Sequence, residues 1–427
     1  MRNLKLSPWS YLILTFAILI IAGSFFLMIP GAYSKGNLSY LDALFTSTSA
    51  VCVTGLIVTN TSNFTLFGQI IILILIQLGA IGIMTLTSSL YIFLRGELDL
   101  SQRIMVAKIT DVFGLHEVES ILIYIIKYTF VFELIGAIFL SIGFYISHYS
   151  LGDAIYYGVF HSISAFCNAG FSTFDQSLIG TNLIVKLTIT SLIVLGGIGY
   201  YVIYDLNKYF KLKSRLKLHT KVVLLTTFTL IIMGVMIFSV VEKEMNVIDG
   251  LFQSVTARTA GFNTIDLTSL HNISKFTLII LMLIGASPGS TGGGVKTTTF
   301  FITISSITKV LRGENKIVVF KRQIPYQTIL RAFALIFLYL FVDVTATLIL
   351  LYIYDYNFLE MLFEVTSALS TVGLSLGITT KLTAAGKLVI ILCMFLGRVG
   401  PAALVMAMLG REKKRAVQYP EEKVVLG

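Results

Sequence analysis

A glycine-centred segment recurs four times along the chain, and this recurrence constrains the fold more than any other feature. In each copy the glycine is followed by Leu or Phe, a Phe or Leu lies ten positions earlier, and an acid lies further upstream. A single run such as Thr371-Val372-Gly373 is weak evidence, whereas four copies in register indicate an internal repeat. The four glycines are Gly55, Gly170, Gly261 and Gly373.

The composition places these repeats in a membrane. Hydrophobic residues make up 56% of the chain and charged residues 13%, against about 25% charged residues in soluble domains. The first apolar run, Trp9–Ile29, is too long for the core of a signal peptide and lacks a small-residue cleavage site. We therefore interpret it as the first spanning helix of an integral membrane protein.

In each repeat a long apolar span precedes the glycine segment and a second span follows it. The segment itself is too short to cross a bilayer, which needs about 20 apolar residues, so it must enter and return. Such a re-entrant piece is tolerated only where protein buries it or a watery cavity receives it. The predicted first spans are Trp9–Ile29, Val118–Ile146, Val222–Val241 and Ile329–Tyr354. The predicted re-entrant helices are Tyr40–Val53, Asp153–Cys167, Val247–Arg258 and Phe358–Ser370. The predicted second spans are Phe67–Leu94, Asn182–Tyr204, one starting at Lys275, and Lys387–Leu409.

The predicted fold is an all-α polytopic membrane protein with four membrane–pore-loop–membrane repeats. Their arrangement around a single pseudo-fourfold pore is implied by the family resemblance described below. The predicted fold has eight spans and four re-entrant pore helices. The expected boundaries are 1–95, 96–206, 207–310 and 311–410 for the repeats and 411–427 for a cytoplasmic tail. The stretch from Arg95 to Glu117 mixes charges of both signs and is expected to form a cytoplasmic amphipathic segment.

The charge distribution sets the orientation. The net charge of +10 is carried by basic clusters in alternate loops, which is the positive-inside pattern of membrane proteins and not a nucleic-acid surface. Both termini are therefore expected in the cytoplasm of a multi-pass protein of the cell membrane, in contact with lipid. The basic clusters are Lys208, Lys211, Lys213, Arg215, Lys217 and Lys221; Lys309, Arg312, Lys316, Lys321 and Arg322; and Arg411, Lys413, Lys414 and Arg415. The acids near the glycines, in the other loops, are Asp42, Asp153, Asp249 and Glu360.

A Thr-Val-Gly run after a short helix is typical of an ion filter, in which backbone carbonyls replace the water shell of potassium. The helix C-termini that precede the glycines would present negative dipole ends, which favour a cation. The alternative is that these glycines are ordinary helix C-caps, which four copies in register disfavour. The predicted filter residues are Val53, Thr54, Gly55, Asn168, Ala169, Gly170, Thr259, Ala260, Gly261, Thr371, Val372 and Gly373.

The second span of repeat three is interrupted by a glycine-rich segment at 285–297. Gly costs about 1 kcal/mol and Pro about 3 kcal/mol inside a helix, so a continuous helix is not expected there. We interpret the segment as flexible backbone lining a cavity below the filter, and a kinked helix is the alternative. The role of a gate is what the family resemblance described below implies. A nucleotide loop is disfavoured because Val295 separates Gly294 from Lys296. The predicted gate residues are Gly285, Gly289, Gly292, Gly293, Gly294, Lys296 and Arg398.

Charged residues inside spans need partners or water, because a charge at mid-bilayer costs ~2.5–3.5 kcal/mol. Arg398 is interpreted either as an electrostatic barrier below the filter or as a structural residue paired to an acid or to loop carbonyls. Arg258 is expected to point away from the ion and pair with an acid such as Glu364 or Glu244. For Glu133 and Asp343, a buried ion pair and a coupling-ion site both stay open.

Catalytic and metal sites are not predicted. Cys52 and Cys167 share one repeat position and are expected to be small buried apolar residues, and with Cys393 they form no disulfide framework or zinc spacing. His161 is expected to be a buried histidine with satisfied hydrogen bonds. A membrane enzyme using His161 lacks partner residues, so the chain is not expected to be an enzyme.

At these residues the chain resembles the Trk/Ktr/HKT superfamily of potassium transporters, and its KtrB-type subunits more than the longer TrkH type. The resemblance covers essentially the whole chain and is carried by Ser254–Thr264, by the segment 285–297 and by Gly397–Pro401. It implies one filter glycine per repeat, an intramembrane gate at the glycine-rich segment, and Arg398 just below the filter. Gly55 matches potassium-selective members, whereas Asn168 departs from the Thr at the matching position of repeats three and four.

The resemblance further implies a homodimer with one pore per subunit on a cytoplasmic, nucleotide-binding regulatory ring of the KtrA type. The chain has no GxGxxG fingerprint, so such a regulator is expected to be a separate protein that docks on the basic loops. The expected function is a potassium-selective ion-conducting subunit of a regulated K⁺ uptake system. It would hold K⁺ on filter carbonyls without a resident cofactor. Whether Na⁺ is cotransported or only activating, the conduction rate and the regulator's ligand stay open.

The alternative function is a secondary active cation- or sodium-coupled solute transporter with a midplane site at the broken helix. Inverted repeats would be expected of such a transporter. Here each repeat has an odd number of elements, so all four keep one orientation, and this disfavours the alternative.

Overall fold

The computed structural model describes residues 8–82, 117–314 and 316–401, with scattered positions between 83 and 116. The expected amphipathic segment from Arg95 to Glu117, the cytoplasmic tail at 411–427 and the final residues of two predicted second spans (Phe67–Leu94 and Lys387–Leu409) lie outside the described residues.

Four long apolar helices confirm the predicted first spans. They are α1 (Pro8–Leu27), α6 (Val118–Ile146), α10 (Leu218–Val241) and α14 (Tyr326–Ile353). Each is long and apolar enough to cross a membrane. Their outward faces expose large apolar side chains such as Phe25, Phe130 and Phe337, which suits a lipid environment. The total of eight spans stays a prediction.

A short helix follows each long one, where the sequence predicts re-entry. These short helices are α2 (Tyr40–Val51), α7 (Leu151–Phe166), α11 (Val247–Thr256) and α15 (Phe358–Leu369). At the start of α2, the Ser39 hydroxyl accepts a hydrogen bond from the amide of Asp42 at 3.1 Å and donates to its carboxylate at 2.7 Å. Ser150 and Asp153 repeat this reciprocal cap on α7. The acid that recurs upstream of each glycine thus lies in the first helical turn, where the helix dipole stabilises a negative charge.

A helix follows each glycine loop. In repeats one, two and four it ends earlier than the predicted second span, whereas in repeat three it ends next to the predicted break at Gly285. These elements are α3 (Leu66–Ile81), α8 (Leu183–Ile198), α12 (Asn272–Leu283) and α16 (Ala384–Val399). Gly82, Gly199 and Gly400 end three of them with φ of 81°, 97° and 88°. Only glycine adopts such angles readily, so each helix stops there. A glycine with positive φ thus ends this helix in repeats one, two and four, whereas in repeat three the helix ends at the glycine-rich segment.

In repeat two the predicted span Asn182–Tyr204 is not one straight helix. α8 stops at Gly199 and α9 (Tyr200–Leu212) leaves at 94° to it. α9 continues beyond residue 206 to Leu212, and the repeat boundaries stay predictions. A single glycine between apolar runs is tolerated in many helices, which is why the pattern did not reveal the bend.

After the glycine-rich loop (residues 284–296), α13 (Thr297–Leu311) leads to a small hairpin of β1 (Val318–Val319) and β2 (Arg322–Gln323). The strands are antiparallel, with Val319 opposite Arg322. Phe320 and Lys321 form the turn with positive φ, as two-residue hairpins require. This hairpin is a departure from the all-α prediction. Two 3₁₀ turns, η1 (Thr61–Asn63) and η2 (Thr379–Lys381), complete the described elements.

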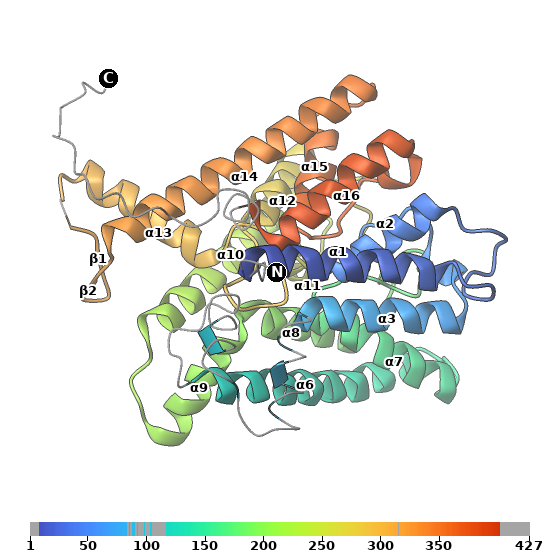
Figure 1. Cartoon of the computed structure of the whole chain (residues 1–427), viewed down its shortest axis with the longest axis horizontal. Coiled ribbons are helices and arrows are strands. Elements are labelled where there is room, and N and C mark those ends of the chain that lie inside the picture. Colours follow the sequence, from blue (N-terminus) through green and yellow to red (C-terminus); the bar gives the residue numbers. More distant parts are fainter. Residues whose placement is uncertain are drawn as a thin grey trace, which may run out of the picture.

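The helices pack in a closed circle. Each long helix packs on the short helix of its own repeat, and each second helix packs on the short helix of the next: α3 on α7, α8 on α11, α12 on α15, and α16 on α2. The blue first repeat and the red end of the last therefore lie side by side (Figure 1). Salt bridges tie two of these junctions, Lys186 to Asp249 and Lys387 to Asp42, both at 2.6 Å.

Candidate functional site

The four recurring glycines meet in a ring. A Cβ built on Gly55 would clash with the Ala169 carbonyl oxygen and lie 3.1 Å from the Cα of Gly170. Gly170 stands in the same relation to Gly261, Gly261 to Gly373, and Gly373 back to Gly55, at 3.0–3.1 Å. All four have positive φ, between 71° and 94°. Segments that are far apart in sequence thus surround one axis, in chain order. We call these glycines with the two residues before each the glycine ring.

The residue two positions before each glycine also has positive φ. Val53 and Asn168 have φ of 58°, Thr371 52° and Thr259 80°. Positive φ is uncommon outside glycine and is a true outlier for β-branched side chains. Such strain is stored at functional sites where the surrounding structure enforces it. Its recurrence at one position in all four repeats marks the ring as the candidate site.

Hydroxyls at the C-terminal ends of the short helices hold this strained backbone. Ser49 accepts from the amide of Gly55 at 3.0 Å, and Ser367 accepts from that of Gly373 at 3.1 Å. Ser164 and Thr256 instead donate to the carbonyls of Phe171 and Phe262, both at 2.8 Å. These four residues were not predicted. A hydroxyl five or six positions before every glycine was the signal that could have revealed them.

The side chain of Asn168, which departs from the repeat pattern, turns away from the axis. Oriented with its amide nitrogen toward them, it donates to the carbonyls of Ala165 at 3.1 Å and Ile193 at 3.2 Å. Its backbone keeps the same positive φ as the other three loops. A site that uses backbone oxygens therefore accommodates this substitution.

A cavity of about 590 Å³ opens on one side of the ring. All four glycines line it together with the loops that follow them, and two acids, Asp175 and Asp266, lie in its wall. Asp175 accepts from Asn60 at 2.9 Å and so joins two repeats. Hydrogen bonds from the hydroxyl and the amide of Thr268 hold the pKa of Asp266 below its usual range. The carboxylate of Asp266 is therefore negative near neutral pH.

The glycine-rich loop closes the other side of the ring. A Cβ on Gly292 would meet the Thr259 side chain, and one on Gly293 would lie 3.0 Å from the Ser370 carbonyl oxygen. The loop folds back on itself through bonds from Gly285 N to Val295 O at 3.0 Å and from Ala286 N to Gly293 O at 3.2 Å. It is an irregular hairpin, so the kinked-helix alternative is wrong. Of the predicted gate glycines, Gly292 and Gly293 lie against the ring, whereas the carbonyl of Gly289 accepts from the amide of Tyr200 at the start of α9. Their role as a gate stays a prediction.

Arg398 fastens this loop to two other repeats. Its guanidinium donates to the carbonyls of Thr291 and Gly79, and to that of Ala80 at 3.1 Å. Among the described residues no carboxylate forms an ion pair with it, so of the pairing alternatives the structure supports loop carbonyls. Since these carbonyls lie on the glycine-rich loop and on α3, Arg398 connects the loop to repeat one. Its interpretation as an electrostatic barrier stays a prediction.

The predicted pairing of Arg258 with Glu364 or Glu244 is wrong. Arg258 is buried and donates to the carbonyl of Gly285 at 3.4 Å. It lies at the inner end of α11, which faces the glycine-rich loop, whereas Glu364 serves the opposite side of the ring. Sequence spacing alone does not distinguish these two sides.

Glu364 and His161 occupy the same repeat position, nine residues before their glycines, and perform the same task. The Nε2 of His161 lies 3.0 Å from the hydroxyl of Ser172, two residues past Gly170. Glu364 accepts from Ser375, two residues past Gly373, at 2.6 Å. Each side chain therefore forms a hydrogen bond with the loop that follows the glycine of its own repeat. His161 is thus a buried histidine with its hydrogen bonds made, as expected.

Glu364 also accepts from the amide of Leu376 at 2.8 Å and from Thr379 at 2.6 Å. In Glu364→Gln, an amide nitrogen would face donors, so we expect the free energy of unfolding to fall by about 1–3 kcal/mol. Thermal unfolding of the purified protein measures this. Glu360→Gln, on the same helix and without a described partner of this kind, is the control. Equal melting temperatures for the two variants would contradict the proposed role of Glu364.

Glu133 and Asp343 form no ion pair among the described residues. Glu133 accepts from Gln77 at 3.0 Å, and Asp343 accepts from Thr366 at 3.0 Å. The Sγ of Cys167 lies 3.6 Å from the Glu133 carboxylate. Cys167 is thus buried but contacts polar groups, which corrects its interpretation as an apolar residue. Cys52 is buried as predicted. No group of metal-binding side chains occurs in the described part of the chain.

Long apolar helices around short helices that meet in a closed ring define an integral membrane protein of the pore type. The TrkH family profile, described as cation transport protein, matches residues 8–415. The chain belongs to this family of cation transport proteins, in its Trk/Ktr branch with KtrB-type relatives. The family groups transporters and not enzymes.

Several relatives match along nearly the whole chain. The Ktr system potassium uptake protein B of Bacillus subtilis is 36% identical, with 99% of this chain and 97% of the relative covered. The potassium/sodium uptake protein NtpJ of Enterococcus hirae is 35% identical over 99% of this chain and 98% of its own length. The crystal structure of the potassium transporter TrkH from Vibrio parahaemolyticus has a TM-score of 0.73 at 20% identity, covering 95% of this chain and 85% of that one. This last likeness supports the fold.

Proposed function

We propose that this chain is the ion-conducting membrane subunit of a potassium uptake system. The observation that carries the proposal is the closed ring of four glycine loops, each with the same strained backbone. Such backbone presents carbonyl oxygens toward one axis, and rings of carbonyls are how potassium pores replace the water shell of the ion. The predicted filter residues are the members of this ring, and the relatives named for potassium uptake support K⁺ as the ion.

Partner-free hydroxyls at the ring support the same proposal. The Oγ1 atoms of Thr54, Thr259 and Thr371 are buried and have no hydrogen-bond partner among the described residues. A buried hydroxyl without a partner carries a cost of about 1–3 kcal/mol, which contact with a hydrated cation would relieve. We assign these hydroxyls to the inner lining of the ion path, next to the glycine-rich loop.

The regulated assembly is also part of the proposal. Relatives named as proteins of a Ktr system support a separate KtrA-type regulator. A homodimer and a plasma-membrane location belong to the proposal as implications of the family resemblance. We place the hairpin and α9 on the cytoplasmic side, because the basic clusters of α9 and β1–β2 gather at one end of the molecule (Figure 1). The name of NtpJ includes sodium, so sodium dependence is an open part of the proposal.

Rubidium uptake into liposomes that hold only this chain tests the function, with K⁺ and Na⁺ as competitors. Inhibition by K⁺ and not by Na⁺ is the expected result. The alternative, a sodium-coupled secondary transporter, predicts that uptake requires an imposed Na⁺ gradient. Because a closed gate would also silence the chain, a variant lacking Gly292–Gly294 is run in parallel. Silence of both would contradict the pore.

The acids of the outer cavity should raise the local cation concentration. We expect Asp266→Asn to lower rubidium uptake a few-fold at low ionic strength, with the difference shrinking above about 0.15 M salt as screening sets in. Because the pKa of Asp266 is lowered, the effect should persist as the pH falls from neutral to about 5 and fade only as the carboxylate protonates.

Asp355→Asn is the control for this prediction. Asp355 is exposed in the loop before α15 and does not line the outer cavity. Salt-dependent losses of equal size in both variants would point to the overall charge of the protein and contradict a role for the cavity wall.

A further inference from the structure

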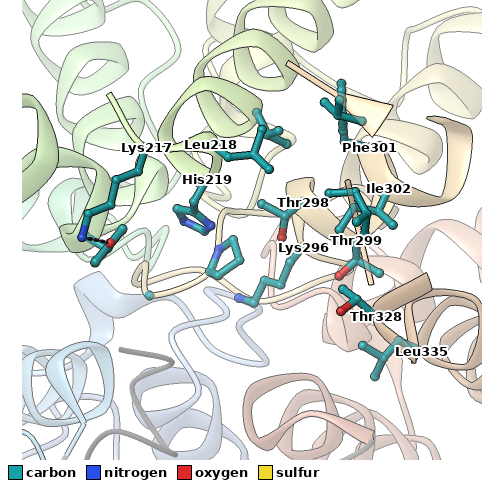
Figure 2. Close-up of a pocket in the computed structure, with 16 residues that line it drawn as sticks. Lys217, Leu218, His219, Lys296, Thr298, Thr299, Phe301, Ile302, Thr328 and Leu335 are labelled. Carbon is teal, nitrogen blue, oxygen red and sulfur yellow. Dashed lines mark hydrogen bonds between the residues drawn. The ribbon is translucent and has the colours of Figure 1, made fainter. Parts of the chain in front are cut away.

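A second cavity, separate from the ring, lies beside the glycine-rich loop (Figure 2). Its volume is about 800 Å³, within the range of small-molecule sites. The start of α10, the start of α13, the hairpin and α14 form its walls, and the glycine-rich loop contributes Pro288, Gly289 and Lys296. It is located at the end of the molecule that carries the basic clusters.

The lining is divided by chemistry. Lys217 and Lys296 bring two ammonium groups, with His219 between them in this view (Figure 2). Most of the remaining wall is apolar and includes Leu218, Ile302 and Leu335. A cavity with cations in one part and hydrocarbon elsewhere matches an amphiphile with an anionic head. A small hydrophilic anion would leave the apolar wall without a partner.

The surroundings extend both halves of this pattern. Outside the cavity, Leu225 of α10 and Ile304 of α13 are each 46% exposed, so the apolar wall continues into the outer surface. On the polar side, the Lys221 ammonium lies 5.9 Å from the ring of Phe320 and connects α10 to the hairpin. Glu117 is already held by Lys208 at 3.1 Å and Lys217 at 3.4 Å.

We propose that this cavity binds an anionic phospholipid. The phosphate lies against Lys217 and Lys296, and one acyl chain follows Leu218, Ile302 and Leu335 toward the membrane. Basic pockets between spanning helices on the cytoplasmic side are suited to anionic lipid headgroups. The occupant is a lipid and not a free phosphate because the apolar wall runs on into the lipid-facing surface.

The lipid would act on the glycine-rich loop. The Lys296 ammonium donates to the Gly292 carbonyl at 2.7 Å, and the amide of Tyr200 donates to that of Gly289 at 2.9 Å. A phosphate beside Lys296 competes with the Gly292 carbonyl for the ammonium and so loosens the loop from the ring. This consequence depends on the proposed function, whereas the binding itself does not.

Lipid retention tests the binding. The full chain is purified from a membrane that contains phosphatidylglycerol, exchanged into phosphatidylcholine, and its retained phosphatidylglycerol is counted by mass spectrometry. Lys217→Gln should lower the affinity about fivefold, since one basic residue near the surface contributes about 1 kcal/mol. Ile302→Trp should lower it by filling the path of the acyl chain. Lys213→Gln, exposed in the same basic stretch, should retain as much as the unaltered chain.

Two further arms identify the occupant. Soluble glycerol phosphate, which carries the same head without a chain, should not displace the lipid. If glycerol phosphate displaces the lipid, or if only Lys217→Gln lowers the lipid retention, the ligand is a free phosphate and not a lipid. Equal retention of phosphatidylglycerol in all variants would overturn the lipid site. If a second copy of the chain covers the cavity instead, Ile302→Trp would change the oligomeric state and leave the retention of phosphatidylglycerol unaltered. Rubidium uptake with and without phosphatidylglycerol is measured separately, so a failed pore and an absent lipid site give different results.

Discussion

Gly261→Ser is expected to remove the preference of the pore for K⁺ over Na⁺. At φ of +80° a side chain costs about 1–2 kcal/mol, and a Cβ there would press on the Val372 carbonyl of the neighbouring loop. Movement of one carbonyl changes the ring of oxygens that replaces the water shell of K⁺. We expect the ratio of K⁺ to Na⁺ inhibition of rubidium uptake to fall at least tenfold, or about 1.4 kcal/mol.

Gly180→Ser separates this effect from backbone strain. Gly180 has φ of +78°, almost the same as Gly261, but a Cβ there would have no atom within 4 Å. The control therefore carries the strain without the clash and should keep its selectivity. A Gly261→Ser protein that remains folded and discriminates as well as Gly180→Ser would contradict the assignment of the ring as the filter.

The arrangement of the repeats was predictable because it follows from patterns that survive in one sequence. Apolar length identifies the four long helices to within a few residues, and the glycine register identifies the four loops. The requirement that re-entrant backbone be buried by protein or face a cavity predicts a pore or vestibule, and the family resemblance implied that the four loops surround a single one. Residues such as Thr54 and Val372 could therefore be assigned to one site without coordinates.

The supporting contacts were not predictable, because they depend on which side of a helix meets which carbonyl. Gly196 and Gly397 are an example. A Cβ on either would collide with the last carbonyls of a short helix, at Phe166 and Leu369 respectively. In the sequence both glycines resemble ordinary small residues of an apolar span. The prediction for Arg258 failed for the same reason, since its guanidinium contacts a backbone carbonyl, that of Gly285, and sequence spacing cannot identify such a partner.

Removal of Gly292–Gly294 is expected to raise rubidium uptake about tenfold or more, which corresponds to a barrier lowered by about 1.4 kcal/mol. Gly292 and Gly293 are the loop residues in contact with Thr259 and Thr371, so their loss withdraws backbone from the inner side of the ring. The bond from Ala286 to the Gly293 carbonyl is lost as well, which frees the hairpin to open. Because Thr291 stays in place, the anchor to Arg398 still attaches the shortened loop to the protein.

Ser290→Ala is the matched control within the same loop. Its hydroxyl bonds only to the Ser287 carbonyl among the described residues, so the hairpin should keep its place and uptake should not change. Both variants are compared at equal amounts of monodisperse protein, with K⁺ and Na⁺ competition. A higher rate that keeps K⁺ selectivity assigns the loop to the gate and the ring to the filter. A rate equal to that of Ser290→Ala would exclude the loop as the barrier, and the restriction would then lie at the glycine ring itself, where four carbonyls converge.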